Sequence, residues 1–78
     1  MTDTPLTLYT RPDCHLCDEA QALLSQAGLI EQVQIVDIEP DLKLIARYGD
    51  KIPVLHHADG QEWCWPFTLQ QLSSITRQ

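Results

Sequence analysis

The sequence predicts a single α/β domain in the order βαβαββα, with a four-stranded mixed sheet and helices on both faces. Apolar residues recur at helix spacing between short runs rich in β-branched residues, so helices and strands alternate along the chain. Two of the strand-like runs flank Asp59-Gly60, a dipeptide typical of a β-hairpin. A chain of 78 residues is too short for a second core, so residues 1–78 form one domain.

The first three elements form a predicted βαβ unit. Residues 6–9 are a strand-like apolar run, and a helical pattern follows over about residues 14–27. Gly28 is then placed to end that helix in the left-handed conformation. Residues 33–38 are a second strand, and a connection of this length makes the two strands parallel with a right-handed crossover.

A second helix is predicted after this unit. Glu39-Pro40-Asp41 opens it, because proline is tolerated in a first turn and acidic side chains there favour the helix dipole. We expect Leu42, Ile45 and Ala46 to form its buried face. Gly49 ends it.

The hairpin consists of predicted strands at residues 51–57 and 61–65. A two-residue turn at Asp59-Gly60 sets Cys64 opposite Leu55, which predicts a small buried hydrophobic role for this cysteine. In the same register both histidines of the hairpin have structural roles, with His57 opposite Glu62 and His56 opposite Trp63.

The C-terminal half of the chain returns to the edge at which the first strand ends. If the third strand pairs antiparallel with the first, Ile52-Pro53 lies beside Cys14, and the fourth strand brings Trp65-Pro66 back to the same edge. A capping box at Thr68-Leu69-Gln70-Gln71 then predicts a last short helix to about Thr76.

Cys14 and Cys17 lie where the first strand gives way to the first helix. Residues three apart on a helix have Cβ atoms roughly 5–6 Å apart, so relaxation at the helix start brings the pair within disulfide reach. Free N–H groups at a helix N-terminus stabilise an anion, and we expect an exposed Cys14 with a lowered pKa and a largely buried Cys17. Such a pair can attack a disulfide and then resolve the mixed disulfide internally.

Other interpretations of the two cysteines stay open. A structural disulfide closing so short a loop contributes only about 2 kcal/mol. A zinc site needs a second ligand pair, and no suitable spacing exists among the remaining candidates, Cys64, His15, His56 and His57. Two alternatives are a pair that holds an iron–sulfur cluster or another metal, and a pair in an interaction domain without redox turnover.

Charge and composition limit the partners. The formal net charge of −6 argues against binding to nucleic acid or to anionic membranes. We expect no signal peptide in residues 1–5, and no apolar run approaches the ~20 residues of a membrane span. An odd number of cysteines fits the reducing cytoplasm, and we expect a monomer there.

The motifs together resemble a glutaredoxin of the thioredoxin fold. The likeness rests on the order of elements, on Tyr9-Thr10-Arg11-Pro12 before the cysteines and on Ile52-Pro53, and it covers nearly the whole chain. It is strongest to small bacterial glutaredoxin-like proteins with a Cys-His-Leu-Cys site and a Trp-Pro-Phe stretch. It implies a thiol–disulfide oxidoreductase with Cys14 as nucleophile and Cys17 as resolving thiol. It also implies a cis bond at Ile52-Pro53, whose preceding backbone pairs with the substrate. Thioredoxins usually have a buried acidic residue six positions before the first cysteine, and this chain has Leu8 there, which favours a glutaredoxin.

Three further residues complete the predicted site. Arg11 is expected to stabilise the thiolate or bind a substrate carboxylate, and a protonated His15 to favour the thiolate. Trp65 lies near the same edge, where it forms either a wall of the substrate groove or part of the ordinary core. Acidic neighbours disfavour the thiolate, namely Asp13, Asp18 and Glu19.

Glutathione is predicted to bind weakly, with no tightly held cofactor and no metal. Where glutaredoxins bind the γ-glutamyl end of glutathione, this chain has Pro66, which lacks an N–H, and Thr68, which caps its own helix. Phe67 adds bulk at the same place. We therefore expect electrons to come from a protein partner docked over Cys14, Ile52 and Trp65.

Overall fold

The computed structural model describes residues 6–76, and the predicted absence of a signal peptide concerns residues 1–5, which lie outside this part. The elements follow the predicted order: β1 (Leu6–Thr10), α1 (His15–Gln26), β2 (Val33–Asp37), α2 (Leu42–Tyr48), β3 (Val54–His57), β4 (Glu62–Cys64) and α3 (Leu69–Thr76). A short 3-10 helix, η1 (Ile30–Gln32), precedes β2 and was not predicted. Among the described residues, no helix is long and apolar enough to cross a membrane.

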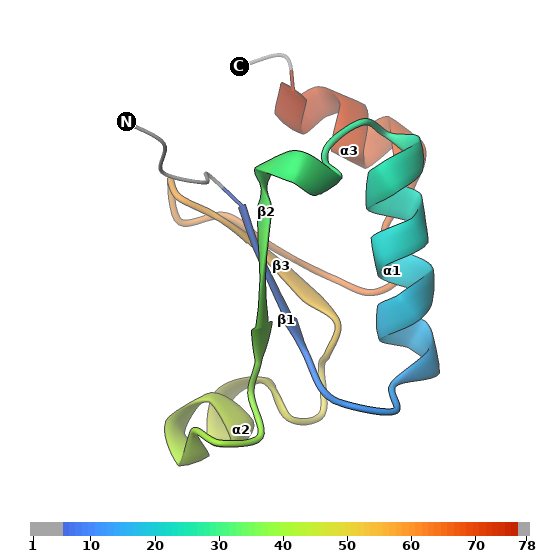
Figure 1. Ribbon diagram of the computed structural model, residues 1–78. Coiled ribbons are helices and arrows are strands. Elements are labelled where there is room, and N and C mark those ends of the chain that lie inside the picture. Colours follow the sequence, from blue (N-terminus) through green and yellow to red (C-terminus); the bar gives the residue numbers. More distant parts are fainter. Residues whose placement is uncertain (1–5, 77–78) are drawn as a thin grey trace.

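The four strands form one mixed sheet in the order β2-β1-β3-β4. β1 is parallel to β2 and antiparallel to β3, and β3 is antiparallel to β4. The sheet predicted from the sequence is therefore confirmed. Because Tyr9 pairs with Val54, the end of β1 lies beside the start of β3, which is the edge from which the chain continues to α1 (Figure 1).

Helices cover both faces of this sheet, as predicted. Leu8 of β1 and Leu55 of β3 are fully buried on the face that α1 and α3 cover. Figure 1 shows these two helices together on one side, with α2 apart from them near the end of β2. On the α2 side a smaller core contains Ile38, Tyr48 and Val54.

Two of the predicted helix ends are confirmed. Gly28 has a φ of 78°, and the following Leu29 N–H donates to the Leu24 carbonyl at 2.9 Å, which satisfies an otherwise free carbonyl at the end of α1. At the start of α3, the Thr68 N–H donates to the Gln71 side chain at 3.0 Å, and the Gln71 N–H donates to the Thr68 hydroxyl at 3.1 Å. This reciprocal pair is the predicted capping box.

The predicted buried face of α2 is confirmed only for Ile45, which is half-buried and packs against the core on this side, and is wrong for the other two residues. The carboxylate of Asp41 accepts the Lys43 N–H at 2.9 Å, so α2 begins only at Leu42, and Leu42 is 81% exposed. Ala46 is exposed as well, and Tyr48 is the buried residue. Gly49 does follow the helix, but with a right-handed φ of −52°.

The predicted hairpin register is also wrong, by one residue. The His57 N–H donates to the Gln61 carbonyl at 2.8 Å, which leaves a three-residue loop with Gly60 at a φ of 103°. A shift of one residue moves side chains to the opposite face of a sheet. Cys64 therefore pairs with Val54 and is exposed, where the sequence predicted burial opposite Leu55. The other two pairs move accordingly, to Leu55 with Trp63 and His56 with Glu62.

Tyr48 connects α2 to two strands of the sheet. Its ring stacks on Tyr9 with the centroids 4.4 Å apart, and its hydroxyl donates to the Glu62 carboxylate of β4 at 2.6 Å. The pKa of Tyr48 is raised to about 12, mainly because the side chain is buried and to a smaller extent because of the hydrogen bond to Glu62. The contacts of Tyr48 explain why it, rather than Ala46, faces the sheet.

We predict that Tyr48 stabilises the fold in a pH-dependent way. Its pKa is higher in the folded protein than its ordinary value of 10.0, so the stabilisation is complete below pH 10 and is lost as the pH rises towards 12. The difference in free energy of unfolding between the wild type and Tyr48→Phe should be about 1 kcal/mol near neutral pH and should fall over this range. Urea unfolding at a series of pH values measures it.

Tyr9→Phe is the control for this prediction, because it keeps the ring stack and the Tyr48–Glu62 hydrogen bond. This variant should retain the alkaline loss of stability. An alkaline loss of the same size in Tyr48→Phe as in the wild type would contradict the assignment to Tyr48.

Candidate active site

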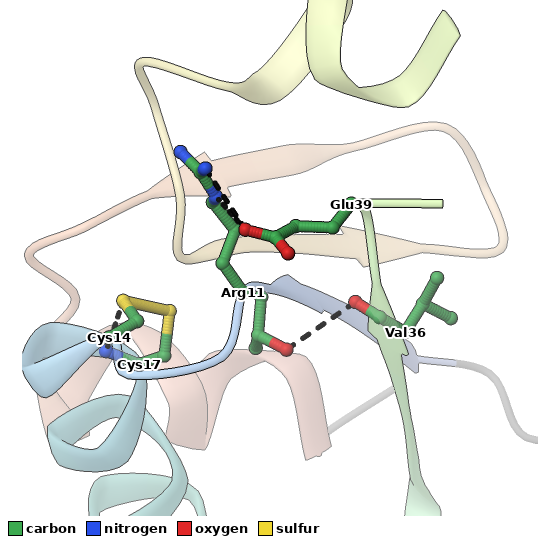
Figure 2. Close-up of a disulfide and its surroundings, with 6 residues drawn as sticks. Arg11, Cys14, Cys17, Val36 and Glu39 are labelled. Atoms are coloured by element: carbon green, nitrogen blue, oxygen red, sulfur yellow. Dashed lines mark hydrogen bonds and ion pairs between the residues drawn. A yellow bond between two sulfur atoms is a disulfide. The ribbon is translucent and has the colours of Figure 1, made fainter. Parts of the chain in front are cut away.

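The candidate site begins where the chain leaves β1. Asp13 has a φ of 58°, which turns the chain so that Cys14 becomes the N-cap of α1. Cys14 and Cys17 are joined by a disulfide with their Cα atoms 5.2 Å apart (Figure 2). The structure thus brings the two predicted redox residues together in their oxidised form.

The Cys14 sulfur takes the position of a helix-capping acceptor. The Cys17 N–H donates to Cys14 Sγ at 3.1 Å, and the Asp18 N–H donates to the Cys14 carbonyl at 3.2 Å. A helix N-cap is usually a serine, threonine, aspartate or asparagine, whose side-chain oxygen accepts such an N–H. Here a sulfur does so, and the N–H groups and dipole at the start of α1 favour negative charge on it.

The two sulfurs differ in their access to solvent. Cys17 is 2% exposed and belongs to the buried face of α1, together with Ala20 and Leu24. Cys14 is half-buried, so it is less exposed than the sequence predicted. A substrate can therefore approach Cys14 but not Cys17.

Arg11 pairs with a residue that sequence reasoning missed. Its Nη2 and Nε lie 3.1 and 3.3 Å from the same carboxylate oxygen of Glu39, and Figure 2 shows the guanidinium directed at that carboxylate. Glu39 was considered only as a start signal for α2. The parallel register pairs Thr10 with Asp37, so the residues that follow β1 and β2 lie at the same edge of the sheet. Extending this register by two residues would have predicted that Arg11 and Glu39 lie close together.

His15 also pairs with a carboxylate. Its Nε2 lies 2.8 Å from Glu19 Oε2, one helical turn further along α1, and its side chain is 85% exposed. The histidine therefore stands on the solvent side of the helix start, next to Cys14 in sequence. The two basic side chains nearest Cys14 in the sequence, Arg11 and His15, each have a glutamate partner.

The segment before β3 lies at the same edge. Pro53 is buried, and the Ile52-Pro53 peptide bond is cis. The half-buried Ile52 donates its N–H to the Tyr48 carbonyl at 3.1 Å, so this donor already has a partner within the chain. The Pro53 carbonyl accepts the Trp65 N–H at 3.1 Å, which ties the end of β4 to this segment.

Trp65 and the residues after it link β4 to α3. The half-buried Trp65 packs edge-on against Phe67, with the ring centroids 5.3 Å apart, and Phe67 is 5% exposed. The Trp65-Pro66 peptide bond is also cis, which the sequence analysis did not predict. Part of the Trp65 side chain therefore packs against the core, and only the part that stays exposed can contact a substrate.

Residues 6–76 contain no group of three or more histidine, cysteine, aspartate or glutamate side chains arranged to hold a metal ion. The two histidines of the hairpin, His56 and His57, lie on β3, and the His57 ring lies beside Asp59.

Comparisons with known proteins place the chain in a family. Residues 5–75 match the model of the Glutaredoxin-like domain (DUF836). An X-ray structure of protein XcR50 from X. campestris is 42% identical with a TM-score of 0.83, covering 92% of this chain and 95% of that one. A solution structure of Ne2328 from Nitrosomonas europaea is 27% identical with a TM-score of 0.73, covering 91% and 88%. No curated protein matches the sequence. The chain therefore belongs to the glutaredoxin-like family, and the resemblance seen in its sequence is confirmed.

Proposed function

We propose that this protein is a thiol–disulfide oxidoreductase in which Cys14 attacks a disulfide and Cys17 resolves the mixed disulfide. One observation carries the proposal: Cys14 Sγ is the N-cap acceptor of α1, 3.1 Å from the Cys17 N–H. The same N–H that contacts the sulfur in the disulfide is placed to stabilise a thiolate in the reduced protein. Family membership supports a redox role of this kind.

The reaction follows from the difference between the two sulfurs. In the reduced protein the half-buried Cys14 thiolate attacks one sulfur of the substrate disulfide, forms a mixed disulfide and releases the first substrate thiolate. The buried Cys17, as its thiolate, then attacks Cys14 Sγ and releases the second. Two electrons pass to the substrate, its two thiolates take up protons, and the protein is left with the Cys14–Cys17 disulfide.

We further propose that a protein, rather than glutathione, supplies the electrons. The N–H groups of Thr68 and Gln71 are already used in the capping box of α3, and Pro66 has none to donate. Phe67 fills the core beside them. A partner would instead approach the edge formed by Cys14, Ile52 and the exposed part of Trp65.

The proposed setting is the reducing cytoplasm, with the protein acting as a monomer. An exposed free thiol at Cys64 supports a reducing compartment, because such a thiol is prone to oxidation elsewhere.

Anaerobic purification distinguishes the redox proposal from an iron–sulfur or other metal-binding module. Colourless protein without bound metal is expected, whereas a coloured, metal-loaded protein would favour the module.

The mixed disulfide can be trapped. We expect Cys17→Ser, made together with Cys64→Ser, to accumulate a covalent adduct with a disulfide-containing protein such as insulin, because the resolving thiol is gone and the nucleophile remains. Non-reducing electrophoresis and mass spectrometry detect the adduct. The matched control is Cys14→Ser with Cys64→Ser, which should form none. An adduct through Cys17 in that control would reverse the two assigned roles.

Glutathione disulfide should bind weakly. Losing two neutral hydrogen bonds at about 1 kcal/mol each weakens binding by about one to two orders of magnitude relative to glutaredoxins that make them. Calorimetric titration of Cys14→Ser made together with Cys64→Ser measures binding without reaction at an accessible thiol, and a glutathione-coupled disulfide assay of the wild type should show low turnover. Micromolar affinity, or turnover like that of ordinary glutaredoxins, would show that the Trp-Pro-Phe stretch is a tolerated substitution.

A further inference from the structure

We propose that Glu39 determines the substrate specificity of this site by holding Arg11 in an ion pair, which makes Cys14 discriminate against anionic disulfides. The inference rests on the proposed function, because it concerns which disulfides Cys14 attacks. Arg11 is three residues before Cys14 and is the nearest basic residue that precedes it in the sequence. Its guanidinium is engaged by Glu39, at 3.1 and 3.3 Å.

The backbone holds Glu39 in place for this contact. Ile38 is fully buried, and its N–H donates to the Thr10 carbonyl at 2.9 Å, which joins the ends of β1 and β2. The Glu39 N–H donates to the Asp37 carboxylate at 2.9 Å. Arg11 follows Thr10 directly, so the same pairing of strand ends that fixes Glu39 also fixes the start of the Arg11 side chain.

The ion pair favours the Arg11 conformation that contacts Glu39, but an anionic ligand can still compete for the guanidinium. Both guanidinium donors share one carboxylate oxygen, and the two side chains are 43% and 45% exposed. Exposed pairs of this kind change an equilibrium by about fivefold at most. An anionic ligand must compete with Glu39 for Arg11, so the pair lowers the affinity for anions without blocking the site.

A second basic side chain contacts a carboxylate on the other side of Cys14. His15, the next residue, contacts the Glu19 carboxylate at 2.8 Å. Both basic side chains that flank the nucleophile therefore contact a carboxylate of the same chain, which carries a formal net charge of −6. A site with this charge favours neutral or cationic disulfides over anionic ones.

The test compares one anionic and one neutral disulfide in the Cys64→Ser background. Reduced protein reacts with dithiobis(nitrobenzoate) or with hydroxyethyl disulfide, and mass spectrometry of quenched samples gives both rates. The ratio of the anionic rate to the neutral rate cancels any change in the thiolate fraction of Cys14. Glu39→Gln should raise this ratio by about three- to fivefold at low ionic strength, and salt should reduce the gain.

Two further variants separate release of Arg11 from simple loss of charge. Glu31→Gln removes the same charge from an exposed residue before β2, and should leave the ratio within about twofold of the wild type. In an Arg11→Gln background, Glu39→Gln should no longer raise the ratio, because there is no guanidinium to release.

The outcomes distinguish this inference from the proposed function. An unchanged ratio in Glu39→Gln, or a gain that persists without Arg11, would overturn the role of Glu39 while the neutral disulfide is still reduced. Failure of every variant, and of the wild type, to reduce the neutral disulfide would instead contradict the proposed oxidoreductase.

Discussion

The contact between the Cys17 N–H and Cys14 Sγ is the interaction on which the proposed chemistry depends. It exists because a sulfur stands at the N-cap of α1, where the first N–H groups of a helix have no partner of their own. Asp13 has a left-handed backbone conformation, which turns the chain between β1 and α1 and so places the Cys14 sulfur at the N-cap. A disulfide-forming residue is thus placed where the backbone favours its anion, and its partner Cys17 is the buried residue of the first turn of α1.

The rest of the fold holds this helix start beside the ends of the central strands. Ala20 and Leu24 pack α1 onto the fully buried Leu8 of β1. β1 lies between β2 and β3, so the ends of β1 and β2 and the start of β3 meet at one edge. That arrangement supplies the two neighbours of the site, Glu39 from the end of β2 and Ile52 from the segment before β3.

The sequence predicted the helix caps and the strand pairing of the sheet correctly, but not the length of the hairpin loop or an ion pair between distant residues. Helix caps such as Gly28 and Thr68 are determined within a few residues and were predicted correctly. The exposure of Cys64 depends on a loop of three rather than two residues, which Asp59-Gly60 alone does not distinguish. The Arg11–Glu39 pair joins residues 28 positions apart and follows only from the parallel register of β1 and β2.

The pH dependence of Cys14 alkylation tests the central claim most directly. The rate with iodoacetamide is measured on the reduced Cys64→Ser protein, with mass spectrometry to locate the modified cysteine. If the start of α1 stabilises the thiolate, the apparent pKa of Cys14 lies below the free-thiol value of about 8.5, and Cys17 reacts far more slowly. An apparent pKa at or above about 8.5 would contradict the account.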